Sequence, residues 1–101
     1  MNELLRARRL FRLQCFINDV TALFNEMADG KNPRGRLKRI KGYKLSFATT
    51  KKEDPELVPL VETCERLRIE LTDGKPYDQR KSDEIDRLFA EFEREVKQFE
   101  L

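Results

Sequence analysis

Apolar residues recur every three or four positions along the first part of the chain. Between residues 10 and 27 the spacings are 3, 4, 3, 4 and 3, which places these side chains on one face of an α-helix. Gly30 and Pro33 follow, and both residue types end helices, glycine by taking a left-handed cap. The pattern predicts a helix over residues 3–29, whose apolar face comprises Leu10, Leu13, Ile17, Val20, Phe24 and Met27.

Two more amphipathic patterns occupy the second half of the chain. The sequence Asp54-Pro55-Glu56 is typical of a helix start and predicts a helix over 55–72, although Pro59 disfavours helical geometry at Val58 and delays the regular helix to that point. Asp73-Gly74-Lys75-Pro76 ends it. Ser82 is the N-cap candidate of a last helix over 81–99. Phe24 and Phe92 are expected in the core of the bundle.

The segment between the first two helices has a different pattern. Tyr43, Leu45 and Phe47 alternate with smaller or polar residues, a period of two that favours a β-strand, and Lys41-Gly42 suits a two-residue turn. We therefore expect a basic hairpin or irregular arm over 30–53, with a short helical turn over Leu37 and Ile40 as the alternative. Either Tyr43, Leu45 and Phe47 all face the core, or Tyr43 is exposed.

Together these elements predict a mainly α fold, in which three amphipathic helices form a small bundle with the basic arm between the first and the second. A length of 101 residues predicts one domain over 1–101. The order helix, basic hairpin, helix resembles in topology the small head-completion proteins of tailed phages over about the first two thirds of the chain, without a shared motif.

Composition narrows the class of protein. Hydrophobic residues make up 39% and charged residues 40%, which indicates a folded rather than a disordered chain. No apolar run approaches the roughly 18 residues that cross a bilayer, and no signal peptide is evident, so we expect a cytoplasmic protein without membrane contact. Cys15 and Cys64 show no metal or redox spacing and are expected to be reduced thiols.

The charge is divided unevenly along the chain. Residues 1–29 carry four basic and four acidic side chains, residues 30–52 nine basic and none acidic, and residues 53–101 eight basic and fifteen acidic. This asymmetry indicates a polyanionic partner, an internal acidic face, or both. The candidate binding residues are Arg34, Arg36, Lys38, Arg39, Lys41, Tyr43, Lys44, Lys51 and Lys52.

Arginines also line the start of the first helix. There the apolar face becomes basic, which indicates either a solvated helix end whose arginine stems cover the core or a lip for an acidic partner, such as the last helix of the chain itself. This secondary basic lip comprises Arg6, Arg8, Arg9 and Arg12.

The inventory of reactive side chains argues against catalysis. The chain has no histidine, and neither cysteine has a partner that would make it a nucleophile. No phosphate-binding loop or metal-ligand spacing occurs, so no cofactor, metal or small-molecule substrate is expected.

The sequence therefore predicts a small non-catalytic binding module whose segment 31–52 contacts a polyanion, nucleic acid or a nucleic-acid-associated complex before others. In that case an exposed Tyr43 would stack on an unpaired base. The first alternative is a helical regulator or inhibitor, such as one of phage or mobile-element origin, that docks on an acidic protein surface. The second is an assembly component that forms homo-oligomers.

Overall fold

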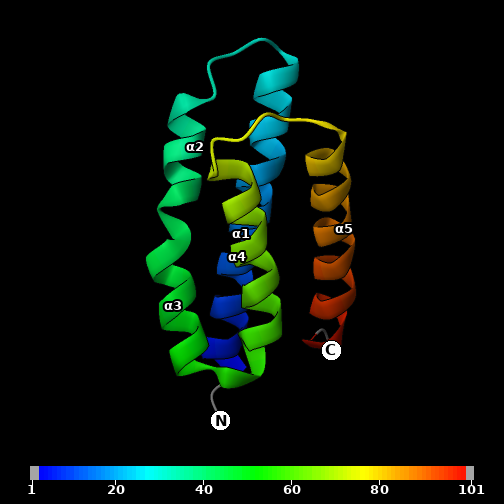
Figure 1. Cartoon of the computed structure of the whole chain (residues 1–101). Coiled ribbons are helices and arrows are strands. Elements are labelled where there is room, and N and C mark those ends of the chain that lie inside the picture. Colours follow the sequence, from blue (N-terminus) through cyan, green and yellow to red (C-terminus); the bar gives the residue numbers. More distant parts are fainter. Residues whose placement is uncertain (1–2, 100–101) are drawn as a thin grey trace.

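The computed structural model describes residues 3–99, which form an antiparallel bundle of helices (Figure 1). The chain runs up through α1 and down through α2 and α3, which follow one another as a single bent arm. It then runs up through α4 and down through α5. The α-helices are α1 Glu3–Ala28, α2 Arg34–Lys41, α3 Tyr43–Glu53, α4 Val58–Thr72 and α5 Gln79–Val96, and two short 3-10 helices are η1 Pro55–Leu57 and η2 Lys97–Phe99.

The expectation of a hairpin or irregular arm between the first two helices is wrong. Residues 34–53 form α2 and α3, and the described chain contains no strand. Gly42 has φ −67° and ψ −14°, so it continues the helix instead of taking the positive φ of a hairpin turn. Ile40, Phe47 and Thr50 then share one helical face and are buried. Leu45, which strand pairing would have placed beside Phe47, lies opposite and is 77% exposed.

Residues 34–53 form helices for a physical reason: in a helix the segment satisfies its own backbone hydrogen bonds. A two-stranded hairpin would leave two strand edges unpaired, whereas the helix presents only side chains to its neighbours. Without a hairpin, the topological similarity to the phage head-completion proteins no longer holds for this chain.

Helix ends follow the glycine signals of the sequence closely. Gly30 has φ +72° and ends α1, with the Lys31 amide donating to the Glu26 carbonyl at 2.9 Å. Gly74 has φ +75° after α4. Ser82 is not the N-cap of α5, because Asp78 takes that position and accepts from the Lys81 amide at 2.9 Å.

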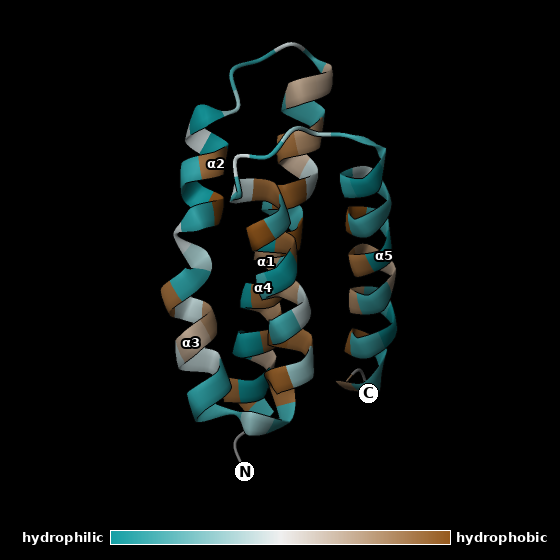
Figure 2. Ribbon diagram, in the orientation of Figure 1, coloured by the Kyte–Doolittle hydropathy of each residue, from teal (hydrophilic) through white to brown (hydrophobic). Residues whose placement is uncertain are grey.

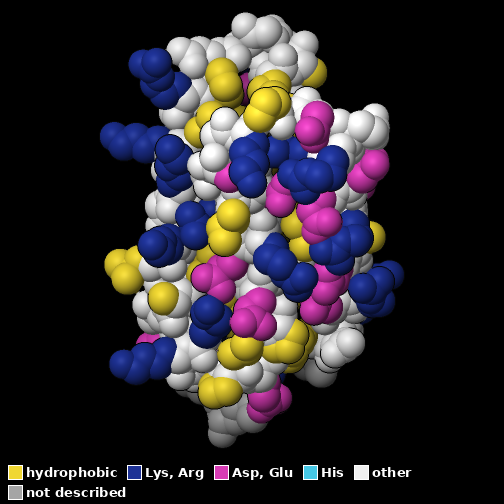
Figure 3. Space-filling model, viewed as in Figure 1, with side chains coloured by type: hydrophobic (Ala, Val, Ile, Leu, Met, Phe, Trp, Pro, Cys, Tyr) yellow, Lys and Arg dark blue, Asp and Glu magenta, His cyan; other side chains and the backbone are white. Residues whose placement is uncertain are grey.

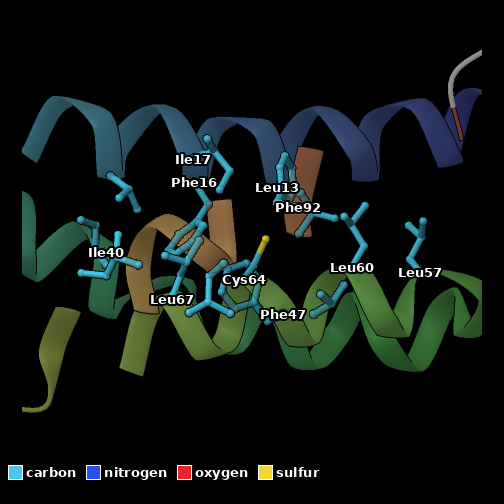
Figure 4. Close-up of a cluster of buried hydrophobic side chains, with 14 of the residues drawn as sticks. Leu13, Phe16, Ile17, Ile40, Phe47, Leu57, Leu60, Cys64, Leu67 and Phe92 are labelled. Carbon is cyan, nitrogen blue, oxygen red and sulfur yellow. The ribbon is translucent and has the colours of Figure 1, made fainter. Parts of the chain in front are cut away.

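One cluster of buried apolar side chains holds the helices together (Figure 4). The hydropathy colouring shows apolar residues at intervals along α1 and α4 (Figure 2). Phe16 of α1 meets the Tyr43 and Phe47 rings edge to face, with centroids 5.2 and 5.0 Å apart. On the other side α5 packs mainly on α4, where Phe92 is 2% exposed.

Two further features of the structure, the state of a buried cysteine and the length and polarity of the helices, bear on function. Cys64 is buried and not in a disulfide, and burial raises the pKa of its thiol above the usual range, which disfavours the reactive thiolate. Over residues 3–99, each helix is too short or too polar to cross a bilayer.

The phenylalanines of the chain differ in how deeply they are buried. Phe92 is buried as expected, whereas Phe24 is only partly buried and packs edge-on against Tyr77 with ring centroids 6.0 Å apart. We expect Phe92→Ala to lower the free energy of unfolding by about 3–5 kcal/mol and Phe24→Ala by less. Phe11→Ala, at a position 70% exposed, should change little. Urea unfolding measures all three, and equal losses would contradict this packing.

Candidate functional site

The inner side of the arm is fastened to α1 by one buried carboxylate. Asp19 accepts hydrogen bonds from three groups of the arm: the Arg36 guanidinium at 2.7 Å, the Tyr43 hydroxyl at 2.7 Å and the Arg39 guanidinium at 3.2 Å. Its side chain is only 8% exposed, so these bonds replace the water that the charge would otherwise need. Arg36 also pairs with Glu26 at 2.9 Å, and both acids raise its pKa.

Tyr43 belongs to this inner side of the arm, where its side chain is partly buried. Its ring stacks on Phe47 with centroids 5.8 Å apart and meets Phe16 edge to face. Burial, followed by the hydrogen bond to Asp19, raises the pKa of Tyr43 to about 12. This packing engages the ring and the hydroxyl of Tyr43 but leaves part of the side chain exposed, so its stacking on an unpaired base stays a prediction.

A second buried carboxylate fastens the opposite end of the arm. Asp54, at the junction of α3 and η1, accepts two hydrogen bonds from Arg6 at 2.6 and 2.8 Å, and Arg9 approaches it at 3.4 Å. The hydrogen bonds from Arg6 are the main cause that lowers the pKa of Asp54. The Arg6 guanidinium also lies 5.4 Å from the centroid of the Phe99 ring. Arg6 and Arg9 of the secondary lip thus bind the end of the arm.

The outer side of the arm carries a row of cations. Arg34, Lys38, Lys41 and Lys52 are exposed, and Leu45 lies among them. Positions 34, 38, 41, 45 and 52 differ by 4, 3, 4 and 7 residues, so at 3.6 residues per turn they fall within about 60° of one another. We call this set the outer row. The space-filling view shows Lys and Arg side chains along the edge of the molecule that α2 and α3 form (Figure 3).

Ion pairing separates the nine cations of the basic segment into two groups. Arg36, Arg39 and Lys51 make ion pairs, Lys51 with Glu65 of α4 at 2.7 Å. The other six, which are the four cations of the outer row with Lys31 and Lys44, make none with residues 3–99. Lys44 lies on the α4 side of the arm, two turns before Lys51. Within the secondary lip, Arg8 and Arg12 are exposed and likewise make no ion pair with the described residues.

Sequence reasoning missed the two acids that organise this surface. A signal for Asp19 was available, because it lies three positions after Phe16 and four before Leu23, within the apolar face of α1. An acid on that face needs a cationic partner when it is buried. Asp54 was interpreted as a helix cap, but its side chain makes no cap hydrogen bond and binds Arg6 instead.

Among residues 3–99, no group of three or more Cys, Asp and Glu side chains is arranged to hold a metal ion. No known protein family, curated protein or solved structure matches the chain with significant similarity.

Ionisation of Tyr43 reports the contact with Asp19. In a Tyr77→Phe variant Tyr43 is the only tyrosine, and its phenolate absorbance should appear near pH 12. Because the pKa is raised in the fold, its contribution to stability is complete below about pH 10 and is lost as the pH rises through the folded value. Adding Asp19→Asn should lower this pKa, whereas Asp29→Asn, at the exposed end of α1, should not. A midpoint near 10 in the folded Tyr77→Phe protein would disprove the contact.

Acid should weaken the contact at Asp54. Its pKa is lowered in the fold, so its contribution to stability is complete above the ordinary aspartate value and is lost as the pH falls through the folded value. The difference in unfolding free energy between the wild type and Asp54→Asn should be constant from pH 7 to 5 and narrow below about pH 4. Asp86→Asn, at an exposed position, is the control. A difference that does not change with pH means that Asp54 is not paired.

Proposed function

We propose that the protein is a non-catalytic module that binds double-stranded nucleic acid through the outer row of α2 and α3. The observation that supports this most strongly is the alignment of Arg34, Lys38, Lys41 and Lys52 on one exposed helix face without ion pairs among the described residues. Like charges at such spacings repel one another in the free protein. A phosphate backbone relieves that repulsion, and each contact releases counterions from the nucleic acid.

The arrangement of side chains favours a duplex over a single strand. Proteins that bind single strands combine cations with exposed aromatic rings on which bases stack. Both aromatic residues of the arm, Tyr43 and Phe47, pack inward. Lys52 follows Arg34 by 18 positions, so the outer row is about 27 Å long at 1.5 Å per residue, a line of charge along the bent arm that suits duplex phosphates.

The composition of the row favours contacts to phosphates over reading of bases. Asn and Gln, which pair with adenine edges, are absent from it, and its Arg and Lys side chains, although they can bind guanine edges, contact phosphates on any sequence. We therefore expect binding with little sequence preference.

An acidic protein surface is the alternative partner, and the exposure of Leu45 among the cations supports it. The two partners differ in their dependence on salt. Duplex affinity falls steeply and log-linearly with salt concentration, whereas an interface with an apolar centre responds less.

A charge-matched pair of variants tests the proposal. Replacing Arg34, Lys38 and Lys41 with Gln should reduce the slope of log affinity against log salt by about three units. The control replaces Lys75, Arg94 and Lys97, three exposed cations away from the arm, with Gln and removes the same charge. Fluorescence anisotropy with a short duplex at several salt concentrations measures both variants.

The control variant decides between a site and a general charge effect. If it lowers the slope as much as the arm variant does, net charge alone attracts the duplex and the outer row is not the site. If the unsubstituted protein binds no duplex at low salt, the proposal fails. Circular dichroism should show unchanged helical content for both variants, because none of the six side chains makes an ion pair within the described residues.

A further inference from the structure

A shallow groove of about 420 Å³ runs beside the outer row, where the junction of α2 and α3 lies against α1. Its lining comes from both sides: Arg12 from α1, and Arg39, Gly42, Tyr43 and Ser46 from the arm. Gly42 contributes no side chain, so this part of the groove remains open. The groove therefore brings Arg12 of the secondary lip and the basic arm, far apart in sequence, to one place.

The residues that line the groove include two arginines and no acid, and Asp19, the partner of Arg39 and Tyr43, is already hydrogen-bonded. One oxygen of Asp19 accepts from Arg36, and the other accepts from Tyr43 and Arg39. The Arg39 side chain is 67% exposed and donates its Nε hydrogen to Asp19, so its terminal nitrogens remain as donors. Arg12 makes no ion pair with residues 3–99, and the Ser46 hydroxyl adds a donor.

We propose that this groove is a subsite for one phosphate group, held between the guanidinium groups of Arg12 and Arg39 with the Ser46 hydroxyl as a further donor. Two guanidinium forks match the several oxygens of a phosphate better than they match a single carboxylate. The inference rests on the proposed function, since Arg39 adjoins Lys38 of the outer row and the same backbone can reach both. If the subsite holds a phosphate of the duplex, the duplex lies across the arm toward α1, and not toward α4.

A pair of single substitutions tests the direction of the duplex. Arg12→Gln and Lys44→Gln each remove one exposed charge without an ion pair among the described residues, but Lys44 lies on the α4 side of the arm. Affinity varies with salt to the power of about −0.9 per phosphate contact, so Arg12→Gln should weaken duplex binding about eightfold at 0.1 M salt and reduce the slope by about 0.9. Lys44→Gln should leave the slope unchanged. Equal effects of the two variants would overturn the subsite.

Arg12→Lys separates geometry from charge at the same position. It should retain the slope, because one charge remains, and still weaken binding, because the bidentate fork is lost. Full affinity in Arg12→Lys would show that Arg12 acts only as a point charge and would overturn the phosphate geometry.

Inorganic phosphate, titrated without any duplex, distinguishes the source of the phosphate. In ¹⁵N-resolved NMR spectra we expect saturable shifts of the amides at Arg12, Arg39 and Ser46, which Arg12→Gln abolishes, and the duplex should shift the same amides. Saturable phosphate binding without duplex binding would support the subsite, assign it to a free phosphate compound and reject the proposed function. Duplex binding that depends on Arg34, Lys38 and Lys41 but not on Arg12, with no phosphate shifts, would reject the subsite alone.

Discussion

The arrangement of the arm depends on the Asp19 carboxylate. A buried charge is unfavourable unless it is hydrogen-bonded and paired, and among residues 3–99 this one is satisfied by groups of α2 and α3. Arg36, Arg39 and Tyr43 must therefore face α1, which fixes the rotation of the arm about its own axis. Once that rotation is set, helical geometry sends Arg34, Lys38 and Lys41 outward. The exposed row follows from the inner contact.

The bundle thus divides one basic segment between two tasks. Cations on the inner side of the arm are matched by acids of α1 and α4, among them Glu26 and Glu65. Those on the outer side have no acid within ion-pair distance among residues 3–99. The charge asymmetry of the sequence is therefore partly internal and partly left for a partner. The proposal concerns only the second part.

The sequence predicted the bundle helices well because α1, α4 and α5 have strong apolar periodicity, and Gly30 and Gly74 mark two of the ends. It failed at the arm for a physical reason. Tyr43, Leu45 and Phe47 fit a period of two, and the competing helical spacing of Ile40, Phe47 and Thr50 runs across Gly42, a residue that favours turns. The positions of the arm's cations can be read from the sequence. Which of them face inward could not be predicted, because that depends on Asp19 and Asp54, acids remote in sequence from their partners.

The two buried carboxylates also have a thermodynamic consequence for recognition. Basic segments that are disordered when free must lose conformational entropy as they bind, and they bury new apolar surface in doing so. The arm here is already helical and is held at Asp19 near one end and at Asp54 at the other. Its backbone therefore has no ordering left to undergo on an anionic partner. Association through the arm would proceed with a small change in heat capacity, and mainly by the release of ions.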